Sequence, residues 1–441
     1  MPRNVLVIND YQKQAATVVE LPHLKSNGQV EIEAIQILNR YNVDTIYTTV
    51  EELVRRCAGL RSLYGITSGL GRDSVECFRD KLEMKVQCEK AGFPVSKFRK
   101  VGTGADIVAF LKEFGYPAII KPTNGISSYG VKVIKNDKDM NDYIKDMYLV
   151  ENTCDEKSGG DVIIESFVNA RMVHVNGFAR NGVIELMWPF LYIATNLCFT
   201  TGSSYGNVLI PTSSPRYMAI KKATQHLLDS LPCPDRLIFH LELFEEPDPE
   251  APSPVDSAIG FENAEKRRDS VNEMGPFKYS LCEIAARKPG ATITELINRC
   301  ETSLLPQDHP SKRMDVFSEM DFRLCLGLPL RHNRMEWSRY ARDQAERSEL
   351  FGHGRGGGGF LVADLIVPLQ RGKLEAVPKG EECPVAKIGQ VFTGYNALKV
   401  NTCARILLTL QDEEGVTERQ AAERLAEAEK WYKAGVKYSS C

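Results

Sequence analysis

Residues 237–244 read Leu-Ile-Phe-His-Leu-Glu-Leu-Phe, and this alternation is the most informative pattern in the chain. The apolar residues stand at every second position, which is the period of a β-strand with one buried face. The odd positions share the apolar face, whereas His240 and Glu242 share the opposite face. We therefore predict a strand that carries an imidazole and a carboxylate on one side of a sheet.

A second strand is predicted within Phe277–Lys288, where Glu283, Ala285 and Arg287 share one face. If the two strands are neighbours, Glu283 and Glu242 converge near a guanidinium. Two carboxylates on apolar strands repel each other unless a cation lies between them. Mg²⁺ favours one or two carboxylates together with nucleotide phosphates. A solvated sheet face with a Glu–Arg ion pair is the alternative, and the strands alone leave both interpretations open.

The loop Gly125–Gly130 follows Lys121 and lies between two predicted strands. Its glycines let the backbone approach a bound group closely, and its amides with the Ser127 and Ser128 hydroxyls can donate hydrogen bonds to phosphate oxygens. The loop is not a Walker A motif, because no Gly-Lys-Ser/Thr follows and a strand comes next instead of a helix. A flexible turn rich in glycine and serine remains the alternative.

The first eighty residues alternate between predicted strands and helices. Val5–Ile8 and Val43–Tyr47 are short apolar runs that predict strands. Glu31–Arg40 and Glu51–Leu60 are predicted to be helices. Because strands that alternate with helices favour parallel pairing, we expect residues 1–80 to form a small parallel α/β unit.

The middle of the chain predicts two helices and a series of strands. The helices are Asp80–Ala91, which ends at Gly92, and Ala105–Phe114. The strands are predicted at 116–122, 131–135, 161–168, 171–178 and 182–187. The last two flank Asn181-Gly182, a dipeptide that strongly indicates a tight β-hairpin.

Three further segments stand out by composition or capping. Residues 245–270 hold four prolines and more acidic than basic residues, which predicts a surface insertion over 245–275. Gly352–Gly359 holds six glycines and predicts a flexible loop or a close backbone approach. Thr417 and Gln420 form a capping box for a final helix that ends at Gly435.

Composition excludes several classes of protein. The 441 residues carry a formal net charge of −3, whereas a general nucleic-acid binder would have a strong basic excess. No apolar run approaches the roughly 20 residues that span a bilayer, and the run at the start is too short for a secretory signal. The 12 cysteines include no Cys-x-x-Cys pair, so we expect reduced thiols in a cytoplasmic protein.

Six ordered motifs resemble the ATP-grasp superfamily, and within it the carboxylate–amine ligases related to carnosine synthase and bacterial dipeptide (L-amino acid) ligases. The motifs span roughly residues 80–300, about half of the chain. In chain order they are Asp80-Lys81-x-x-Met84, Pro117-x-x-x-Lys121-Pro, Gly125-x-Ser127-Ser128-x-Gly130-Val131, Ile163-Ile164-Glu165-x-Phe167-Val168, His240-x-Glu242 and Glu283-Ile-Ala-Ala-Arg287.

The resemblance implies an α+β ATP-grasp fold within the α/β class. Residues 1–80 would form the N-terminal parallel α/β unit that precedes the ATP-grasp region. Residues 81–170 would form a small lid subdomain with the phosphate loop. Residues 171–441 would form a large antiparallel-sheet catalytic subdomain that includes the acidic insertion 245–275 and a C-terminal capping region.

Positions that match the motifs acquire implied roles at a nucleotide. Lys81 and Lys121 would contact the phosphates, and Lys121 would take part in catalysis. The loop would close over the β- and γ-phosphates, with contacts from Gly125, Ser127, Ser128 and Gly130. The hinge whose backbone recognises adenine would contain Glu165, Phe167 and Val168.

The remaining implied roles concern metal and substrate. Glu242 and Glu283 would bind Mg²⁺, for which Mn²⁺ could substitute. Arg287 would stabilise the transferring phosphoryl group and bind the acyl-phosphate. His240 would orient phosphate or act as a base for the amine, with a structural hydrogen bond to the backbone as the alternative. Gly290 precedes a predicted helix, whose free N-terminal amides could hold a substrate carboxylate.

Two positions depart from the family pattern. Many relatives have an acidic residue seven positions after the hinge glutamate that holds the ribose hydroxyls, and this chain has Met172 there. Ala285 stands where many relatives have a metal-binding Asn. Ribose recognition would then come from elsewhere, and the metal shell would depend on the two glutamates.

The expected function is an ATP-dependent, ADP-forming ligase that joins a small carboxylic or amino acid to an amine through an acyl-phosphate. ATP and Mg²⁺ are the expected cofactors, and the partners are the two small-molecule substrates, with no nucleic acid and no membrane. A homodimer is left open. Two alternatives remain: an ATP-grasp carboxylase that uses bicarbonate, and a catalytically inactive nucleotide-binding regulatory protein.

Overall fold

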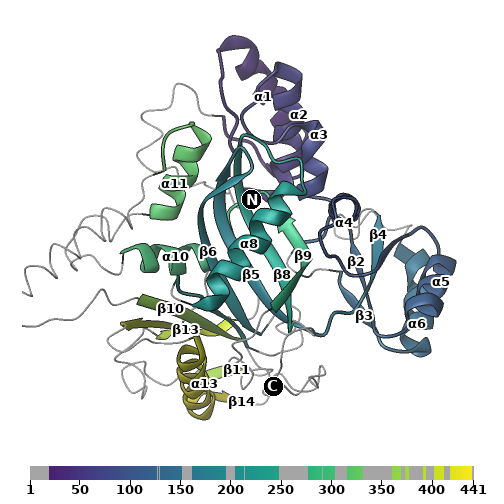
Figure 1. Cartoon of the computed structure of the whole chain (residues 1–441), viewed down its shortest axis with the longest axis vertical. Coiled ribbons are helices and arrows are strands. Elements are labelled where there is room, and N and C mark those ends of the chain that lie inside the picture. The colour runs from purple at the N-terminus through teal and green to yellow at the C-terminus, as the bar shows by residue number, and fades with distance from the viewer. Residues whose placement is uncertain are drawn as a thin grey trace, which may run out of the picture.

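The structure of the chain is a computed structural model (Figure 1). It describes residues 19–126, 128, 130–150, 161–194, 204–212, 214–247, 277–290, 292–302, 315–330, 360–368, 373–376, 391–393, 402–411 and 418–439. Within these ranges, two separate sheets carry most of the strands, and helices cover both faces of the larger one.

The large sheet is antiparallel throughout, in the order β12-β13-β10-β7-β6-β5-β8-β9. Its strands are β5 (Arg171–Arg180), β6 (Val183–Ala194), β7 (Tyr205–Leu209), β8 (Arg236–Pro247), β9 (Phe277–Ala285), β10 (Phe360–Pro368), β12 (Val391–Thr393) and β13 (Thr402–Gln411). Adjacent positions 237–243 alternate between the two faces, and the odd ones are buried in the main core, as the sequence predicts.

Each face of the large sheet packs against its own helices. The odd-numbered face of β8 packs with α8 (Pro215–Asp229), and the same core includes residues of α4 (Lys81–Lys90) and α13 (Glu418–Gly435). The opposite face packs with α10 (Ile293–Thr302) and α11 (Val316–Cys325) through a second core. The sheet is therefore buried on both sides, and polar side chains on it must find partners inside the protein.

A smaller four-stranded sheet lies beside the large one, in the order β1-β4-β2-β3 (Figure 1). Its strands are β1 (Phe98–Val101), β2 (Ala118–Pro122), β3 (Lys132–Ile134) and β4 (Val162–Ser166). The helices α5 (Gly104–Phe114) and α6 (Asp137–Val150) pack against it to form a separate core. A two-stranded sheet of β11 (Lys373–Ala376) and β14 (Lys437–Ser439) completes the described strands.

The predicted hairpin is present between β5 and β6. Asn181 and Gly182 both have left-handed backbone angles, with φ of 50° and 77°. These angles characterise the tight type I′ turn, whose twist matches that of the flanking strands. The predicted helix ending at Gly435 is also confirmed as α13, whose buried face includes Leu425, Ala428 and Tyr432.

The predicted strand at Val43–Tyr47 is wrong. Residues 42–50 have no regular secondary structure, and the described chain from 19 to 80 contains helices but no strand. Those helices are α1 (Gln29–Arg40), η2 (Glu51–Leu53), α2 (Val54–Tyr64), α3 (Arg72–Val75) and η3 (Glu76–Phe78). Hydrogen bonds from side chains hold this extended segment in place of a neighbouring strand. Arg61 donates to the Ile46 carbonyl, and Thr45 donates to the Cys325 carbonyl.

Several predicted segments lie outside the described residues. They are the strand at Val5–Ile8, the insertion from residue 248 onward, the segment Gly352–Gly359 and the capping residue Thr417. Among the helices that the structure does describe, none is long and apolar enough to cross a membrane.

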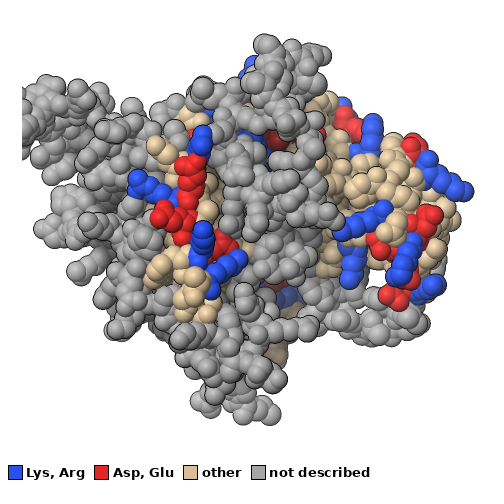
Figure 2. All heavy atoms as spheres, turned by 90° about the horizontal axis from the view of Figure 1, so that it is seen from below, with Lys and Arg blue, Asp and Glu red and all other residues tan. Residues whose placement is uncertain are grey.

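Acidic and basic side chains intermingle on the described surface that is visible from below (Figure 2). Exposed ion pairs one helical turn apart illustrate the pattern, as between Lys138 and Asp142 in α6 or Arg419 and Glu423 in α13. Such pairs contribute little stability, typically below about 1 kcal/mol, because water screens them. The buried charged side chains include Lys81, Lys85, Lys121 and Glu165.

Candidate active site

The two predicted acidic strands are neighbours. In the β8–β9 pair, Glu242 lies directly opposite Glu283, and the register shifts immediately afterwards, between Glu242 and Leu243. This irregularity leaves Cys282 as the extra residue on β9. The structure therefore brings the two carboxylates together, although the sequence separates them.

Glu283 is surrounded by positive charge. Its Oε2 lies 2.8 Å from the Lys81 Nζ, at the start of α4. Burial works against ionisation, but Lys81, Lys121 and Arg287 outweigh burial and hold the pKa of Glu283 well below its ordinary value. Glu283 is therefore a carboxylate at neutral pH, and it is paired with Lys81.

Glu242 has a different set of neighbours. Its Oε1 accepts a hydrogen bond from the Tyr192 hydroxyl at 2.7 Å and lies 3.7 Å from the Nε2 of His240. Burial opposes ionisation, yet the neighbouring His240 helps to lower the pKa of Glu242 below its ordinary value. Sequence reasoning missed Tyr192, which stands on β6 two strands away from Glu242.

Lys81 links the acidic strands to the predicted phosphate loop. Its Nζ also donates to the Gly125 carbonyl at 2.8 Å. Asp80 fixes the start of α4, because its carboxylate accepts from the backbone amides of Leu82 and Glu83. This N-cap holds Lys81 in the first turn of the helix, between the loop and β9.

A buried cluster of two lysines and one glutamate joins α4 to the smaller sheet. Lys121 on β2 lies 2.9 Å from Glu165 Oε1, and Lys85 on α4 lies 3.4 Å from Glu165 Oε2. Lys85 is fully buried, and its Nζ also donates to the Ser96 hydroxyl and the Leu281 carbonyl. The cluster carries a net positive charge if all three side chains are ionised.

The charge states in this cluster follow from burial and neighbours. Burial alone would lower the pKa of Lys121, but Glu165 reverses this effect and the pKa is raised. Burial lowers the pKa of Lys85, because Glu165 compensates only in part. Burial opposes ionisation of Glu165, but Lys121 and Lys85 lower its pKa. Lys85 is absent from our sequence prediction, although it follows Lys81 by one helical turn and faces the same core.

Two arginines bond to Asn124, the residue just before the predicted phosphate loop. Asn124 accepts hydrogen bonds from Arg79 through its carbonyl and from Arg55 through its side chain, both at 2.7 Å. Ser128 and Gly130 follow in left-handed backbone conformations. A Cβ on Gly130 would lie 2.9 Å from the Pro122 ring, so the loop needs glycine there. Ser127 lies outside the described residues.

The predicted hinge follows directly after β4. The Phe167 amide donates to the Pro117 carbonyl at 3.1 Å, and the Ser166 amide donates to the Lys97 carbonyl at 2.9 Å. These bonds occupy two of the hinge amides within the fold. No described residue accepts a hydrogen bond from the Val168 amide.

Arg287 lies just beyond β9 and pairs with the N-terminal helices. Its Nε donates to Glu51 in a short contact, and its Nη1 donates to the Lys288 carbonyl at 3.0 Å. Burial would lower the pKa of Arg287, but Glu51 outweighs it and the pKa is raised. Sequence reasoning missed Glu51, because nothing local marks a residue that approaches a strand end from another part of the fold.

Gly290 and Met172 are two further positions that the sequence analysis singles out. Gly290 precedes α10, and its carbonyl accepts from the Ile293 amide at 3.4 Å. Met172 packs against a buried cluster of Tyr192, Tyr205 and Ile366. The methionine therefore contributes apolar contact where many relatives have an acid.

Across the ranges that the structure describes, no group of three or more His, Cys, Asp or Glu side chains is placed to hold a metal ion.

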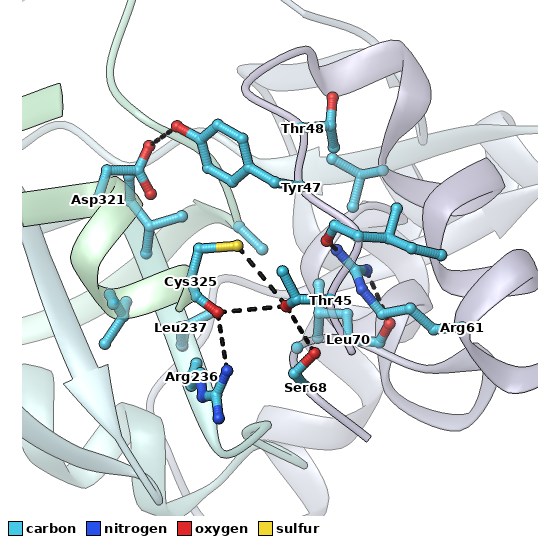
Figure 3. Close-up of a pocket in the computed structure, with 16 residues that line it drawn as sticks. Thr45, Tyr47, Thr48, Arg61, Ser68, Leu70, Arg236, Leu237, Asp321 and Cys325 are labelled. Atoms are coloured by element: carbon cyan, nitrogen blue, oxygen red, sulfur yellow. Dashed lines mark hydrogen bonds between the residues drawn. The ribbon is translucent and has the colours of Figure 1, made fainter. Parts of the chain in front are cut away.

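A cavity of about 70 Å³ lies at the start of β8 (Figure 3), and its lining includes neither Glu242 nor Glu283. Its polar lining includes Thr45, Tyr47, Arg61, Arg236 and Asp321. The Tyr47 hydroxyl donates to the Asp321 carboxylate in a short contact, which ties the N-terminal segment to α11. Burial raises the pKa of Asp321 to about 6 from an ordinary value of 3.8.

Asp321→Asn should stabilise the protein at neutral pH. A carboxyl whose pKa is higher in the folded state contributes its full share of folding stability at pH values below its pKa in the unfolded state. This contribution is lost as the pH rises through 6. Asparagine stays neutral and still accepts from Tyr47, so its advantage should grow between pH 4 and 6 and then level off at about 2–3 kcal/mol. Thermal unfolding from pH 4 to 8 measures this.

Asp315→Asn, at the N-cap of the same helix, is the control, because its effect on stability should change with pH in the opposite direction. Burial opposes ionisation of Asp315, but hydrogen bonds from Ser318 and Asn298 lower its pKa, so its contribution appears as the pH rises. An advantage of Asp321→Asn that is equal at pH 4 and pH 8 would contradict the prediction.

The sequence comparisons agree with this geometry. Residues 88–187 match the family model described as "D-ala D-ala ligase C-terminus". An alanine–anticapsin ligase of Bacillus amyloliquefaciens is 34% identical over 113 residues, which cover 26% of this chain and 24% of that protein. An L-arginine-specific L-amino acid ligase of Bacillus subtilis is 28% identical over 152 residues, or 34% of this chain and 36% of that protein. The chain thus spans about a quarter to a third of the length of these relatives.

Solved structures extend the similarity to the whole chain. An L-amino acid ligase from Bacillus licheniformis superposes with a TM-score of 0.60 at 16% identity, covering 96% of this chain and 87% of that one. An N5-carboxyaminoimidazole ribonucleotide synthetase from Thermotoga maritima gives 0.51 at 17% identity, covering 93% and 85%. At such identities the likeness concerns the fold. The chain therefore has the mixed α/β fold with antiparallel sheets that its ordered motifs predict, and residues 88–187 match the D-Ala–D-Ala ligase C-terminal family.

Proposed function

We propose that the chain is an ATP-dependent ligase that joins a small carboxylic or amino acid to an amine and releases ADP and phosphate. One observation carries this proposal: Glu242 and Glu283 lie directly opposite each other, and Glu283 contacts Lys81, which also reaches the loop at Gly125. Opposed carboxylates beside a lysine that contacts a glycine loop suit a triphosphate and its cation.

The lysine–glutamate cluster supports a nucleotide site between the two sheets. Lys121 and Lys81 would bind phosphate oxygens, and the loop 125–130 would cover them. Glu165 holds Lys121 in place, so the ammonium group is oriented before a phosphate arrives. Phe167 and Val168 would border the adenine, for which the Val168 amide is the available donor among the described hinge residues. With Met172 at the usual ribose position, the ribose contact would come from another residue.

The donor set fits a divalent cation that shares its shell with phosphates. Two ionised carboxylates on adjacent strands provide hard oxygen ligands, and the phosphates would supply the others. Mg²⁺, or Mn²⁺ in its place, supplies charge neutralisation on the transferring phosphoryl group when bound. Lys81 would add positive charge from the side of the loop.

The proposed reaction has two steps. A substrate carboxylate oxygen attacks the γ-phosphorus, the bond to the β-phosphate bridge breaks, and ADP leaves an acyl-phosphate. The amine then attacks the acyl carbon, the carbon–oxygen bond to phosphate breaks, and phosphate departs with the formation of an amide. Arg287, held by Glu51, would stabilise the transferring phosphoryl group, and the start of α10 after Gly290 would hold a substrate carboxylate.

A hydroxylamine trap tests the proposal. Purified protein would be incubated with ATP, Mg²⁺ and a panel of carboxylic and amino acids, because hydroxylamine converts an acyl-phosphate into a stable hydroxamate. We expect ADP and a hydroxamate with at least one acid. ADP release that depends on bicarbonate alone would instead indicate a carboxylase. Nucleotide binding without turnover across the panel would indicate a regulatory protein and contradict the ligase proposal.

The proposal also covers partners, cellular location, oligomeric state and subdomains. Both substrates would be small molecules, without nucleic acid or membrane as a partner. Cytoplasmic location and a homodimeric state stay predictions from the sequence. The predicted subdomains at 1–80, 81–170 and 171–441 also stay predictions.

A further inference from the structure

The cavity at the start of β8 has a buried acid at one end and a buried guanidinium at the other. Figure 3 shows Asp321 beside Tyr47 on one side of the cavity and Arg61 on the opposite side. Asp321 belongs to α11 and Arg61 to α2, so the fold brings them to one cavity from distant parts of the chain. The described lining does not include Arg287 or either glutamate of the acidic pair.

Arg61 is held by backbone carbonyls but has no carboxylate partner among the described residues. Its Nη1 donates to the Leu70 carbonyl at 3.0 Å, and its Nη2 donates to the Ile46 carbonyl at 2.5 Å. The side chain is 8% exposed, and its buried Nε has no hydrogen-bond partner within the described structure. Burial lowers the pKa of Arg61, so the groups nearby do not make up for the water that the guanidinium has lost.

Gly69 keeps the space beside this Nε free of a side chain. It lines the cavity, and its φ of 90° lies in the left-handed region that favours glycine. A Cβ at this position would lie 3.3 Å from the Arg61 Cζ and 3.4 Å from the Nε. The Gly69 amide donates to Asp235 at 2.9 Å, which fixes the backbone there. The unpartnered N–H group therefore stays accessible to a small acceptor.

Asp321 is a buried carboxyl without a cation in contact. It is 2% exposed, and the Tyr47 hydroxyl is its hydrogen-bond donor among the described residues. Burial raises the pKa of Asp321 to about 6 because it outweighs the Tyr47 hydrogen bond and the charge of Lys288. The group is mostly ionised at neutral pH, where an ammonium would compensate its charge. Tyr47 is 38% exposed, so small molecules can reach this end of the cavity.

A structural ion pair does not explain these two side chains. Arg61 and Asp321 line the same cavity, yet neither forms an ion pair within the described structure. A pair that served the fold alone would be in contact, because each buried charge is costly until a partner offsets it. The space between them instead suits a ligand that carries both charges.

The size and walls of the cavity limit that ligand. A volume of about 70 Å³ holds about five water molecules, at roughly 10–15 Å³ each. A ligand of about five to seven non-hydrogen atoms therefore fits. The apolar part of the lining includes Leu70, Leu237, Ile238 and Leu324, which suit a short carbon chain between the two charged groups.

We propose that this cavity binds a small amino acid, with the ligand carboxylate at the Arg61 Nε and the ligand ammonium at Asp321. The inference goes beyond the ligase function proposed above, because this site needs neither a nucleotide nor the acidic pair. Each end of the ligand satisfies a buried group that the fold leaves without a charged partner. A simple anion would leave Asp321 uncompensated, and a simple amine would leave Arg61 so.

Calorimetric titration of the full chain at neutral pH without nucleotide tests the proposal. The probes are glycine, β-alanine and 4-aminobutyrate, which differ in the spacing of their two charges. Each is compared with the fatty acid that lacks the amine and the alkylamine that lacks the carboxylate. We expect at least one amino acid to bind about tenfold or more tightly than both of its analogues, because each charged contact in a buried site adds affinity.

Asp321→Asn removes the partner of the ammonium and keeps an acceptor for Tyr47. The affinity for the amino acid should fall about tenfold or more, while the affinity for the fatty acid stays within about threefold. Arg61→Gln should instead reduce the binding of the amino acid and of the fatty acid alike. Thermal unfolding shows whether Arg61→Gln is folded, and Asp321→Asn decides if it is not. Asp315→Asn, in the same helix region but outside the lining, should bind within about twofold of the wild type.

Glu283→Gln separates this site from the proposed ligase site. Because Glu283 does not line the cavity, this variant should bind the amino acid within about twofold of the wild type. Loss of binding in Glu283→Gln would place the ligand at the acidic pair and overturn the proposal. The absence of binding to all three amino acids, affinities equal to those of the fatty acids, or unchanged binding in Asp321→Asn would overturn it too. Failure of the ligase reaction would leave these results standing, because the titration contains no nucleotide.

Discussion

Glu283→Gln should lower kcat/KM for ADP formation by about 10²- to 10³-fold while the protein stays folded. Gln keeps the size of the side chain but removes the negative charge that faces Lys81 at 2.8 Å and lies opposite Glu242. A divalent cation would lose one of its two protein ligands, and the transferring phosphoryl group would be stabilised less. Steady-state ADP release at saturating Mg²⁺ measures the effect.

Glu246→Gln provides the control on the same pair of strands. Glu246 lies on β8 opposite Lys278, and it is exposed. Its replacement should leave kcat/KM within about twofold of the wild type, because this exposed carboxylate lies four residues along β8 from Glu242. Equal activity of Glu283→Gln and the wild type would show that the acidic pair does not serve phosphoryl transfer.

Lys85→Met should have the largest effect on stability. The Lys85 ammonium is fully buried and supplies charge or hydrogen bonds to Glu165, the Ser96 hydroxyl and the Leu281 carbonyl. Methionine fills similar space but leaves a buried carboxylate with Lys121 as its remaining cation. Removing one partner from a buried ionic cluster costs about 3 kcal/mol or more. We expect the unfolding midpoint to fall by roughly 3 °C or more.

Lys90→Met tests whether any lysine in this helix would behave alike. Lys90 ends α4 and is exposed, so its replacement should change the unfolding midpoint by less than about 1 °C. A Lys85→Met protein as stable as Lys90→Met would mean that Glu165 is satisfied by Lys121 alone. The cluster would then be an ordinary ion pair with a neutral amine beside it.

The parts of the fold that the sequence predicts well are those set by local patterns, such as the alternation of apolar and polar residues along a strand. The β8 strand and the Asn181-Gly182 hairpin depend on neighbours within a few residues, and both are confirmed. The opposition of Glu242 and Glu283 follows from two such strands, provided that they pair. The extended segment 43–47 has the same apolar character, but it bonds to Arg61 and Cys325 instead of to a strand.

Partners that meet only through packing are harder to predict. Lys85 and Glu165 are eighty positions apart, and their contact depends on how α4 approaches the smaller sheet. Glu51 reaches Arg287 from the N-terminal helices, with no local pattern to mark it. The buried polar side chains of β5 do leave a trace in the sequence, because His174 and Asn176 alternate with valines, as His240 and Glu242 alternate with leucines on β8.

Transfer of labelled oxygen tests the proposed chemistry most directly. An acid identified by the hydroxylamine trap would be labelled with oxygen-18 in its carboxylate and incubated with ATP, Mg²⁺ and an amine. If the carboxylate attacks the γ-phosphorus, phosphate released in the second step must carry one labelled oxygen from the acid, and mass spectrometry should find one label per phosphate. Unlabelled phosphate, or label that appears in AMP, would contradict an acyl-phosphate route at this site.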